Sequence, residues 1–488
     1  MSCNWPNVTL QEVTSRIGDG LHGTPKYDES GEYYFINGNN LSDGEIVITE
    51  KTKRTSKEEY EKHKKNLNDR TIIVSINGTL GNIAVYNGEK VFLGKSACYL
   101  NVNEDVDKFF IKYVLDSQIF QNYIHNLATG STIKNASLKL MREFDFKLPP
   151  LNVQRSIAGI LKNLSDRIRL NNQINQTLEQ IAQALFKSWF VDFEPTKAKI
   201  AALESGGSEK DALLAAMQAI SGTSLFDAGA SAAGAEEQLT RLQAERPEQY
   251  AELRATAELF PSAMQDSELG EIPVGWEVDS LASKIDVFNG FAFKSGDYVK
   301  QPGIFVLRTK NFNNENIAVR LSDDVFLPEG FGSSHKKYLC EAYDYHLIMV
   351  GASVGKTGII FPCNLPALRN QNMWCFRPKF GARIGKAFTK HMLDELVSQK
   401  VGLASGSARE FFRKGDFQNQ TICFGSEHIQ NSFHSIVFSL LEKQAINVAE
   451  NGCLSALRDA LLPKLLSGEL PMTDTDARLA KVEEPVDV

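Results

Sequence analysis

The stretch GASVGKT, residues 351–357, contains the residue types of a phosphate-binding loop. Such a loop has the pattern G-x-x-x-x-G-K-[ST] between a strand and a helix, so that backbone N–H groups surround the phosphates and the lysine reaches them. Residues 355–357 fit the end of the pattern, but its first glycine should stand where the chain has Val350. The next residues, GIIFP at 358–362, predict a second strand in place of the helix. The pattern therefore argues against a nucleotide site.

Other patterns that carry chemistry are missing from the sequence. It contains no H-E-x-x-H pair, and its only double proline, in LPPL at 148–151, lacks the acidic or amide residue of an amino-methyltransferase loop. Metal sites need several ligands at characteristic spacing, so His125, His346 and His391 are predicted to be structural. Seven cysteines without C-x-x-C spacing predict neither a disulfide framework nor a zinc site. These absences predict a binding protein with no catalytic residue, metal or cofactor of its own.

Composition and charge indicate the compartment and the class of partner to expect for the protein. No stretch approaches the roughly 20 apolar residues of a membrane helix, and the start MSCNWPNVTL lacks the features of a signal peptide. Together with the unpaired cysteines, this predicts a cytoplasmic protein without membrane contact. The net charge is −7, but residues 191–270 contain 6 basic and 14 acidic residues, and 426–488 contain 5 and 10. The acidity is thus concentrated outside the large domains, which leaves room for a nucleic-acid partner.

Polar and basic residues gather in loops between apolar strands in both halves of the chain. Arg and Lys can donate to guanine edges, Asn and Gln can bond adenine with two hydrogen bonds, and Ser, Thr and Lys suit phosphates. The candidate DNA-binding residues are Asn37, Asn39, Asn40, Lys95, Ser96, Ser131, Thr132, Lys134, Arg308, Lys310, Asn311, Lys336, Lys337, Arg369, Asn370, Gln371, Ser407 and Arg409. For any one of them, the alternative is a solvated loop residue. Equivalent loops carry such residues with different identities, as expected if one scaffold reads two sequences.

The chain repeats itself, which decides how GASVGKT is interpreted. Trp5 and Trp276 begin similar passages at an offset of 271. SINGTLGNIAVY (75–86) aligns with MVGASVGKTGII at an offset of 274, and LATGSTI (127–133) aligns with LASGSAR at 276. The counterpart of GASVGKT is NGTLGNI, which has neither the lysine nor the threonine. The shared feature is two apolar strands joined by a glycine-containing turn, so the sequence predicts a β-hairpin in each half.

Each half ends in a predicted long helix. Residues 148–190 align with 424–466, and apolar residues recur in both at intervals of three and four, as in a helix with a coiled-coil-like seam. At 1.5 Å per residue each helix would be roughly 50–60 Å long. Asn171 and Asn175 recur as Asn447 and Asn451 within the apolar stripe. Polar residues there can fix the register of pairing, or they can be solvated flanking positions.

These features predict an α+β fold with an internal repeat. Two mixed α/β domains are each followed by a long helix, and the helices are expected to pair antiparallel, with the domains at opposite ends about an approximate twofold axis. The predicted parts are 1–147, first domain; 148–193, central helix; 194–270, an Ala-rich acidic helical insert; 271–423, second domain; 424–470, C-terminal helix; and 471–488, an acidic disordered tail. In the insert, Ser208 and Asp211 predict the start of a helix with a capping box.

Three segments carry a family resemblance: PPLNVQRSIAGILKNL (149–164), LEQIAQALFKSWFVDFEP (178–195) and LRDALLPKLLSGEL (457–470). With the repeated hairpin, they make the chain resemble the specificity (S) subunit of type I restriction-modification systems over nearly its whole length. The second copy departs from the family's usual helix entry, with FGSEHIQ where the first copy has LPPLNVQ.

The resemblance implies two target recognition domains, each reading one half of a split DNA sequence with a non-specific spacer between the halves. It implies that the long helices measure the spacer and dock two modification subunits, which bind S-adenosylmethionine and methylate adenine. Restriction subunits would add ATP- and Mg-dependent translocation and cleavage. The chain itself would be a non-catalytic subunit that binds double-stranded DNA and partner subunits. The alternatives are a helical scaffold that binds only proteins and, less favoured, a P-loop NTPase or nuclease.

Overall fold

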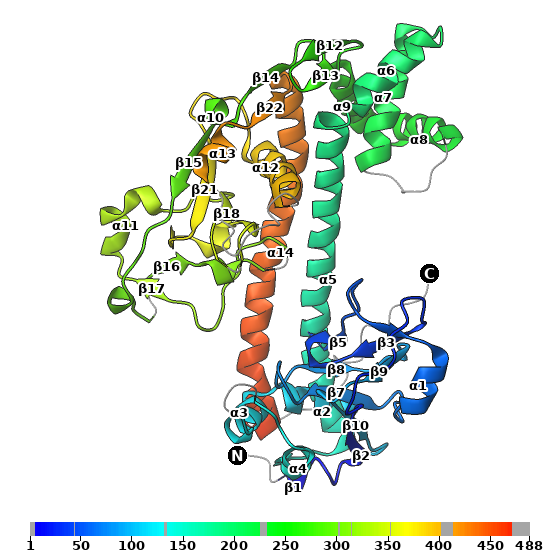
Figure 1. Ribbon diagram of the computed structural model, residues 1–488, viewed down its shortest axis with the longest axis vertical. Helices are drawn as coiled ribbons and strands as arrows, with labels where there is room; N and C mark the ends of the chain where they lie inside the picture. The colour runs from blue at the N-terminus through cyan, green and yellow to red at the C-terminus, as the bar shows by residue number, and fades with distance from the viewer. Residues whose placement is uncertain are drawn as a thin grey trace. The chain divides into compact units, whose positions relative to one another are not determined.

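The computed structural model describes residues 5–42, 44–130, 134–224, 232–300, 303–313, 315–351, 353–401 and 413–470. The chain divides into two compact units: unit 1 is Met1–Arg169 with Cys453–Val488, and unit 2 is Leu170–Gly452. Each unit holds one α/β domain together with sections of both long helices, α5 (Leu151–Phe190) and α14 (Glu427–Ser467) (Figure 1). Among the described residues, no helix has the length and apolar character needed to cross a membrane.

The domain of unit 1 is built on an antiparallel sheet in the order β2-β10-β7-β8. A second sheet, β6-β3-β9, joins β3 to β9 in parallel and to β6 in antiparallel. The strands are β1 (Asn7–Thr9), β2 (Thr14–Asp19), β3 (Tyr33–Ile36), β4 (Leu41–Ser42), β5 (Glu45–Ile46), β6 (Arg54–Thr55), β7 (Thr71–Ser75), β8 (Ile83–Val85), β9 (Val91–Leu93), β10 (Ala97–Val102) and β11 (Asp145–Lys147). The helices are α1 (Lys57–His63), α2 (Lys108–Asp116), α3 (Gln118–Leu127) and α4 (Leu138–Glu143).

The domain of unit 2 repeats this topology, except that the β4-β5 pair of unit 1 has no counterpart among its described strands. Its sheets have the orders β15-β21-β18-β19 and β17-β16-β20, with β16 and β20 parallel, and β14 pairs with β22 as β1 pairs with β11. The strands are β14 (Glu277–Ser280), β15 (Ile285–Asn289), β16 (Ile304–Leu307), β17 (Phe326–Leu327), β18 (Tyr345–Ile348), β19 (Thr357–Ile359), β20 (Ala367–Arg369), β21 (Met373–Pro378) and β22 (Thr421–Phe424). The helices are α10 (Leu281–Lys284), α11 (Gly330–Ser334), α12 (Lys386–Val401) and α13 (Lys414–Gln418). The predicted α+β class and internal repeat are confirmed.

The two predicted hairpins are present. β7 pairs antiparallel with β8, and β18 pairs antiparallel with β19. Gly81 and Gly355 occupy matched turn positions with φ of 89° and 83°, a conformation that residues with a Cβ rarely adopt. Gly355 N donates to Ile348 O at 2.9 Å, and Thr357 begins a strand. GASVGKT is therefore a hairpin turn, and its N–H groups do not ring an anion ahead of a helix.

The long helices pair antiparallel through a buried ladder of amides in unit 2. Asn171 Nδ2 donates to Asn451 Oδ1 at 2.9 Å, and Asn447 Nδ2 donates to Asn175 Oδ1 at 2.8 Å. Gln444 Nε2 adds a bond of 2.9 Å to Asn175 O. Asn171, Asn175 and Asn447 are 1–2% exposed, so they lie inside the seam and are not solvated flanking positions. Buried polar pairs of this kind set the register of paired helices.

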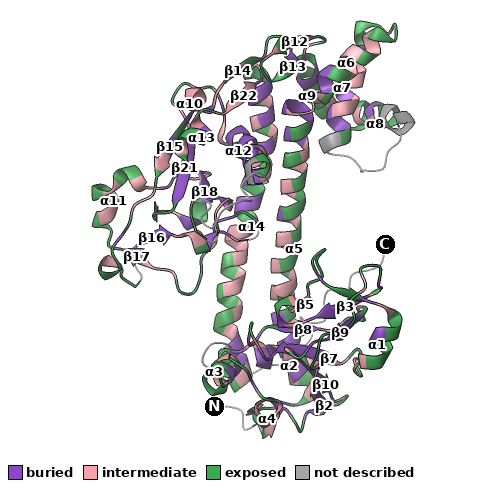
Figure 2. Cartoon of the chain, viewed as in Figure 1, coloured by how far each residue is buried: buried purple, intermediate pink, exposed green. Residues whose placement is uncertain are grey.

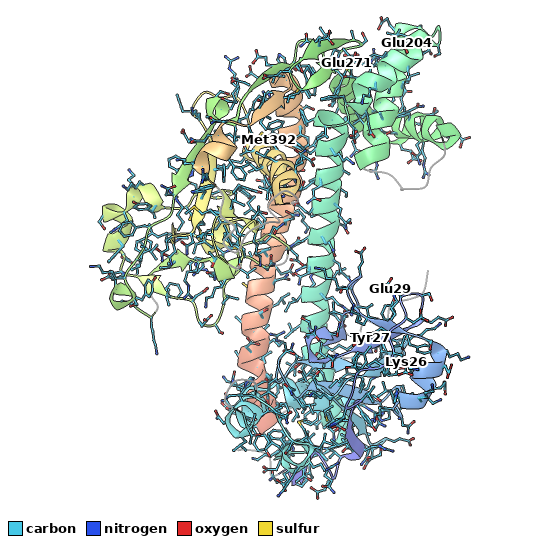
Figure 3. All side chains as sticks on the ribbon, in the orientation of Figure 1. Lys26, Tyr27, Glu29, Glu204, Glu271 and Met392 are labelled. Atoms are coloured by element: carbon cyan, nitrogen blue, oxygen red, sulfur yellow. The ribbon has the colours of Figure 1, made fainter. Side chains whose placement is uncertain are left out.

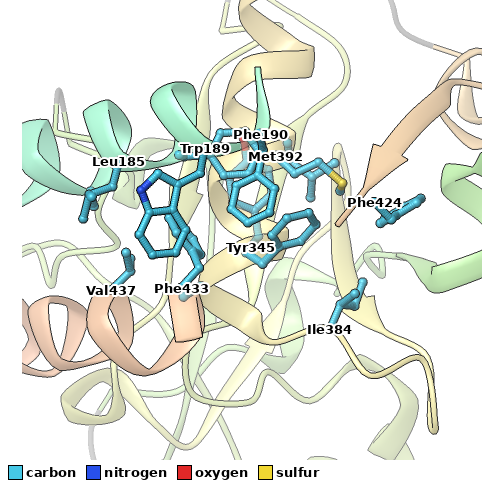
Figure 4. Packing of buried hydrophobic residues seen from close by; sticks show 14 of the residues in the cluster. Leu185, Trp189, Phe190, Tyr345, Ile384, Met392, Phe424, Phe433 and Val437 are labelled. Carbon is cyan, nitrogen blue, oxygen red and sulfur yellow. The ribbon is translucent and has the colours of Figure 1, made fainter. Parts of the chain in front are cut away.

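Apolar residues complete the packing of both helices. In unit 1, Ile157 and Leu161 of α5 share a core with Leu462 and Leu465 of α14. In unit 2, Trp189 and Phe190 of α5 pack against Phe433 of α14 and extend into the second domain, as Figure 4 shows. Strand β18, which contributes Tyr345 and Leu347 to this core, is buried along its length, as its colouring in Figure 2 shows.

The insert is helical only in part. Its helices are α6 (Glu194–Glu204), α7 (Glu209–Ser224), α8 (Ala232–Glu245) and α9 (Pro247–Glu258), and a hairpin follows, β12 (Met264–Ser267) with β13 (Gly270–Pro273). The predicted capping box is confirmed: Ser208 N donates to Asp211 Oδ2 at 2.7 Å, and Asp211 N donates to Ser208 Oγ at 3.3 Å. The insert is fastened to α5 where Phe260 meets Trp189 edge to face, with ring centroids 5.2 Å apart.

Candidate nucleic-acid interface

Each domain places a short 3-10 turn directly after the central strand of its small sheet. The turn Gly38–Asn40 follows β3, and Thr309–Asn311 follows β16. The parallel neighbours β9 and β20 run into adjoining loops, which are tied to the first strands by Gly94 N to Ile36 O at 2.8 Å and Asn370 N to Leu307 O at 2.9 Å. We call residues 37–40 with 94–96 loop pair 1, and residues 308–311 with 370–372 loop pair 2.

The last residue of each turn is an asparagine that shapes the loop. Asn37 N donates to Asn40 Oδ1 at 3.0 Å, and Arg308 N donates to Asn311 Oδ1 at 2.9 Å. The amide nitrogens of Asn40 and Asn311 donate to the next segment of chain, to Val47 O and Val319 O, both at 3.1 Å. Asn311 is fully buried, so the prediction that it contacts DNA is wrong. Both asparagines form the frame of the loop.

Two further candidates in loop pair 1 are also engaged internally. Gly38 N donates to Ser96 Oγ at 2.9 Å, and Ser96 Oγ donates to Asn37 Oδ1 at 2.9 Å. A Cβ on Gly94 would lie 2.2 Å from Asn37 Oδ1, so only glycine permits this approach. Ser96 and Asn37 therefore hold the two loops of the pair together.

Arg369 is a second correction to the predicted interface. Its side chain is fully buried, and its guanidinium donates to Asn289 O at 3.1 Å, to Leu339 O at 3.0 Å and to Lys337 O. Lys337 lies in the 3-10 turn Lys336–Tyr338, Leu339 directly follows this turn, and Asn289 ends β15. Arg369 thus supports this turn from inside and has no surface to offer to a base.

Exposed side chains stand at matched positions in the two loop pairs. Asn39 and Lys310 are the middle residues of the turns, and Lys95 and Gln371 follow β9 and β20 by the same number of residues. All four are exposed. Lys310 forms an ion pair with Asp323, which holds the pKa of that carboxyl below its usual range. The middle position of the turn therefore holds an amide in unit 1 and a lysine in unit 2. The position after the parallel strand holds a lysine in unit 1 and an amide in unit 2.

The remaining candidates lie around these loops. Lys336 and Lys337 are exposed on the turn that Arg369 supports, and Asn370 and Arg308 are half-buried. Lys134 is exposed and donates to His125 O at 2.6 Å. Outside the described residues lie Ser131, Thr132, Ser407 and Arg409.

A small cavity adjoins loop pair 1 that the sequence did not indicate. It measures about 180 Å³ and is lined by Tyr27, Phe35, Asn37, Asn39, Asn40, Thr49, Lys51, Thr52 and Lys53. Tyr27, labelled in Figure 3, is 47% exposed, and Lys53 Nζ lies 5.9 Å from the centre of its ring. Two lysines and no carboxylate line the cavity, so it favours an anionic group.

Two clusters, one buried and one partly buried, bring potential metal ligands together. They are Asp344 with His346 and Cys375, and Glu179 with His391 and Asp394. In each cluster a cation already pairs with a carboxylate: Arg377 Nε donates to Asp344 at 2.9 Å, and Lys390 Nζ donates to Asp394 at 2.9 Å. Burial lowers the pKa of His346 to about 4 and that of His391 to about 3, so both imidazoles are neutral at pH 7. The clusters are best interpreted as ion-paired packing.

The chain is similar in sequence to proteins of a known family. Residues 4–180 match the family described as "Type I restriction modification DNA specificity domain". The chain is 30% identical over 400 residues to the type I restriction enzyme HindI specificity subunit of Haemophilus influenzae, covering 76% of this chain and 83% of that protein. It is 24% identical to the MjaIX specificity subunit of Methanocaldococcus jannaschii, over 95% of this chain and 89% of the relative.

Among solved structures, the chain is similar to the S subunit of a type I restriction-modification system from M. genitalium, with 17% identity, a TM-score of 0.47, and coverage of 96% of this chain and 97% of the other. The 30% identity to the Haemophilus relative, over 83% of its length, shows the family of this chain. The chain belongs to the specificity subunits of type I restriction-modification systems.

Proposed function

We propose that this subunit reads a split DNA sequence, with loop pair 1 at one half-site and loop pair 2 at the other. The observation that carries the proposal is the matched pair of loops. Asn40 and Asn311 build the same turn in both domains, while the exposed positions beside them differ in chemistry. A fixed frame with variable exposed side chains is what two different half-sites require.

The chemistry of the exposed residues suits base edges. Asn39 and Gln371 can each form two hydrogen bonds with adenine, and Lys95 and Lys310 can donate to guanine. Lys51 and Lys53 beside loop pair 1, and Lys336 and Lys337 beside loop pair 2, suit phosphates, which fix the position of the duplex. Asn311 and Arg369 are left out of the interface because they are buried.

The subunit is a non-catalytic component, and its partners supply the chemistry. Specificity subunits work with DNA and with the modification and restriction subunits of their system. We propose that two modification subunits bind this chain along α5 and α14, and that they hold S-adenosylmethionine. ATP and Mg would belong to the restriction subunits. Because its substrate is the DNA of the cell and of invaders, the complex would act in the cytoplasm.

The rival function is a scaffold that binds only proteins through the paired helices. It predicts no sequence-dependent DNA affinity at any ionic strength. A nucleotide-hydrolysing or nuclease role has less support, because GASVGKT forms a hairpin turn and the acidic clusters are ion-paired.

The test is to co-express the chain with its modification subunit and to map methylated adenines across the host genome. We expect a motif of two short fixed halves with a constant gap. The variant Asn39→Lys with Lys95→Gln should change one half only, and Lys310→Asn with Gln371→Lys should change the other only. Lys139→Asn, which alters an exposed residue on α4 outside both loop pairs, serves as the control and should change neither. A complex that binds S-adenosylmethionine but methylates no split motif would contradict the proposal.

A further inference from the structure

A buried ion cluster fastens the second domain to α5. Lys390 of α12, whose side chain is 5% exposed, donates to Glu179 of α5 and to Asp394 of its own helix. Tyr345 of β18 donates its hydroxyl to Asp394 at 2.8 Å, and Gln183 of α5 donates to Glu179 at 2.8 Å. The cluster therefore joins α5, α12 and the main sheet of the domain by bonds of fixed direction. All of it lies within unit 2.

The charges of the cluster are mutually dependent. Burial alone would raise the pKa of Glu179, but the Lys390 ammonium lowers it to about 2. Burial would likewise lower the pKa of Lys390, and the two carboxylates hold it above its usual value. The groups that face Lys390 from the surrounding elements are Glu179, Asp394, Tyr345 and the neutral His391. The ion pair is therefore charged throughout the physiological range.

The first domain has the same pair without the link to a long helix. KFFIKYVLD (108–116) aligns with KAFTKHMLD (386–394), so Lys112 and Asp116 match Lys390 and Asp394. Lys112 lies 2.6 Å from Asp116 and 4.2 Å from the centre of the Tyr113 ring, contacts within its own helix. In this copy, the polar contacts between domain and α5 include hydrogen bonds from Asp107 N to Gln154 Oε1 at 2.9 Å and from Tyr113 to Ser165 at 3.4 Å, and the exposed ion pair Glu45–Arg169.

Open space lies directly beside the cluster of unit 2. A cavity of about 660 Å³ is lined by residues of α5, by the hairpin turn with Lys356, and by α12, including His391 and Asp394. Both nitrogens of His391 lack a hydrogen-bond partner among the described residues. Because one side of α12 borders this cavity, apolar packing alone leaves the helix room to shift. The bond between Lys390 and Glu179 crosses the same interface and opposes that shift.

We infer that the Glu179–Lys390 pair is a positioning device that holds the second domain in one orientation on α5, and so restricts the length of the gap between the half-sites. The inference rests on the proposed reading of split DNA. One added base pair moves a half-site by about 3.4 Å and rotates it by about 35°. A domain that is held by directional buried bonds cannot move with a displaced and rotated half-site. A domain that is held only by apolar contacts beside a cavity can.

The decisive variant is Glu179→Leu in the complete complex with the modification subunit. It removes the link to α5 and leaves Lys390 paired with Asp394, as Lys112 is with Asp116, so no buried charge loses its only partner. Methylated genomic sites are then sorted by gap length. We expect both half-sites to stay unchanged, and sites with a gap one base pair longer or shorter to rise about tenfold relative to the wild type, since the lost hydrogen bond between charged groups contributes a preference of about tenfold.

Two variants control the experiment. Glu179→Asp keeps the carboxylate and should keep the single gap. Glu45→Leu removes the exposed ion pair between the first domain and α5, and should leave the gap unchanged because solvent-exposed pairs hold little. An equal loss of methylation at all gaps in Glu179→Leu, or an unchanged gap distribution, would overturn the inference alone. A wild-type complex with no split motif would overturn the proposed function and this inference with it.

Discussion

The buried bond between Asn175 and Asn447 makes a quantitative prediction about the paired helices. Asn447 Nδ2 donates to Asn175 Oδ1 at 2.8 Å, and both residues are at most 2% exposed. In Asn447→Leu, the amide of Asn175 loses this bond, and its Nδ2 already lacks a partner among the described residues. A buried polar group left unpaired costs about 1–3 kcal/mol, so each single leucine variant should lose about that much stability. The double variant replaces both partners by apolar groups and should regain most of the loss.

The assay is urea unfolding of the full chain followed by tryptophan fluorescence. Three of the four tryptophans, Trp189, Trp276 and Trp374, lie in unit 2, so the signal reports mainly on the unit that contains the asparagine pair. A double-mutant cycle should give a coupling energy of about 1–2 kcal/mol. As a control, removing the exposed ion pair Lys162–Asp166 on α5 should leave the midpoint unchanged. Additive single effects, or singles that unfold like the wild type, would refute the interpretation of the ladder.

Three other predictions follow from described contacts. Lys356→Ala should leave ATP affinity, measured by calorimetry, at the background of the wild type, since its loop is a hairpin turn. His346 has a pKa of about 4 when folded and a higher one when unfolded, so the unfolded chain binds more protons and stability should fall as pH drops from about 6.5 to about 4. His346→Gln should flatten this dependence in unfolding curves at several pH values. Lys336→Ala with Lys337→Ala should weaken DNA binding for all sequences alike and reduce the salt slope by about 2 in a binding titration, whereas a loss at one sequence only would contradict phosphate contacts.

The repeat explains why so much of the fold could be predicted from the sequence. Two copies of one pattern gave independent evidence for each hairpin and each long helix, and the observed bounds 151–190 and 427–467 lie within a few residues of the expected ones. The apolar residues that form the seam between the helices could be predicted less accurately. Leu457 continues the spacing of threes and fours in the second helix but is 47% exposed, while Val437 and Leu441 are buried. One sequence sets the period of a helix better than its rotation, because several apolar stripes satisfy the same spacing.

The errors at the interface have a common physical cause. Arg369 and Asn311 were chosen by residue type, and residue type does not show whether a polar group faces a base or a backbone carbonyl. The two copies contained the missing signal. Asn311 aligns with Asn40, an identity that suits a shared frame, and Arg369 aligns with the inward strand residue Leu93. Tyr27 and the lysines of its cavity were missed because no regular spacing links them to loop pair 1.

In the insert, which has no second copy, less of the structure could be predicted from the sequence. The sequence predicted α7 and its cap, but the later helical part of the insert is interrupted before Pro247, where α9 begins. The hairpin that follows spans the predicted boundary at 270: its first strand falls in the predicted helical insert, and it has few β-branched residues to indicate a strand. Its strands form because a turn with Gly270 at φ 94° joins them.

In each loop pair, one set of residues holds the backbone and another set is exposed. This separation affects which substitutions the protein can tolerate. Asn40 and Asn311 hold the turns through their own side chains, whereas the residues beside them are exposed: Asn39 faces solvent, and Lys310 pairs with the exposed carboxylate of Asp323. A substitution at an exposed site of this kind usually alters stability by less than about 0.5 kcal/mol. If these positions contact bases as proposed, new target preferences can therefore arise one residue at a time without a folding penalty. Under the proposed function, the chemistry presented to each half-site is thus separable from the hydrogen bonds that fold the loop.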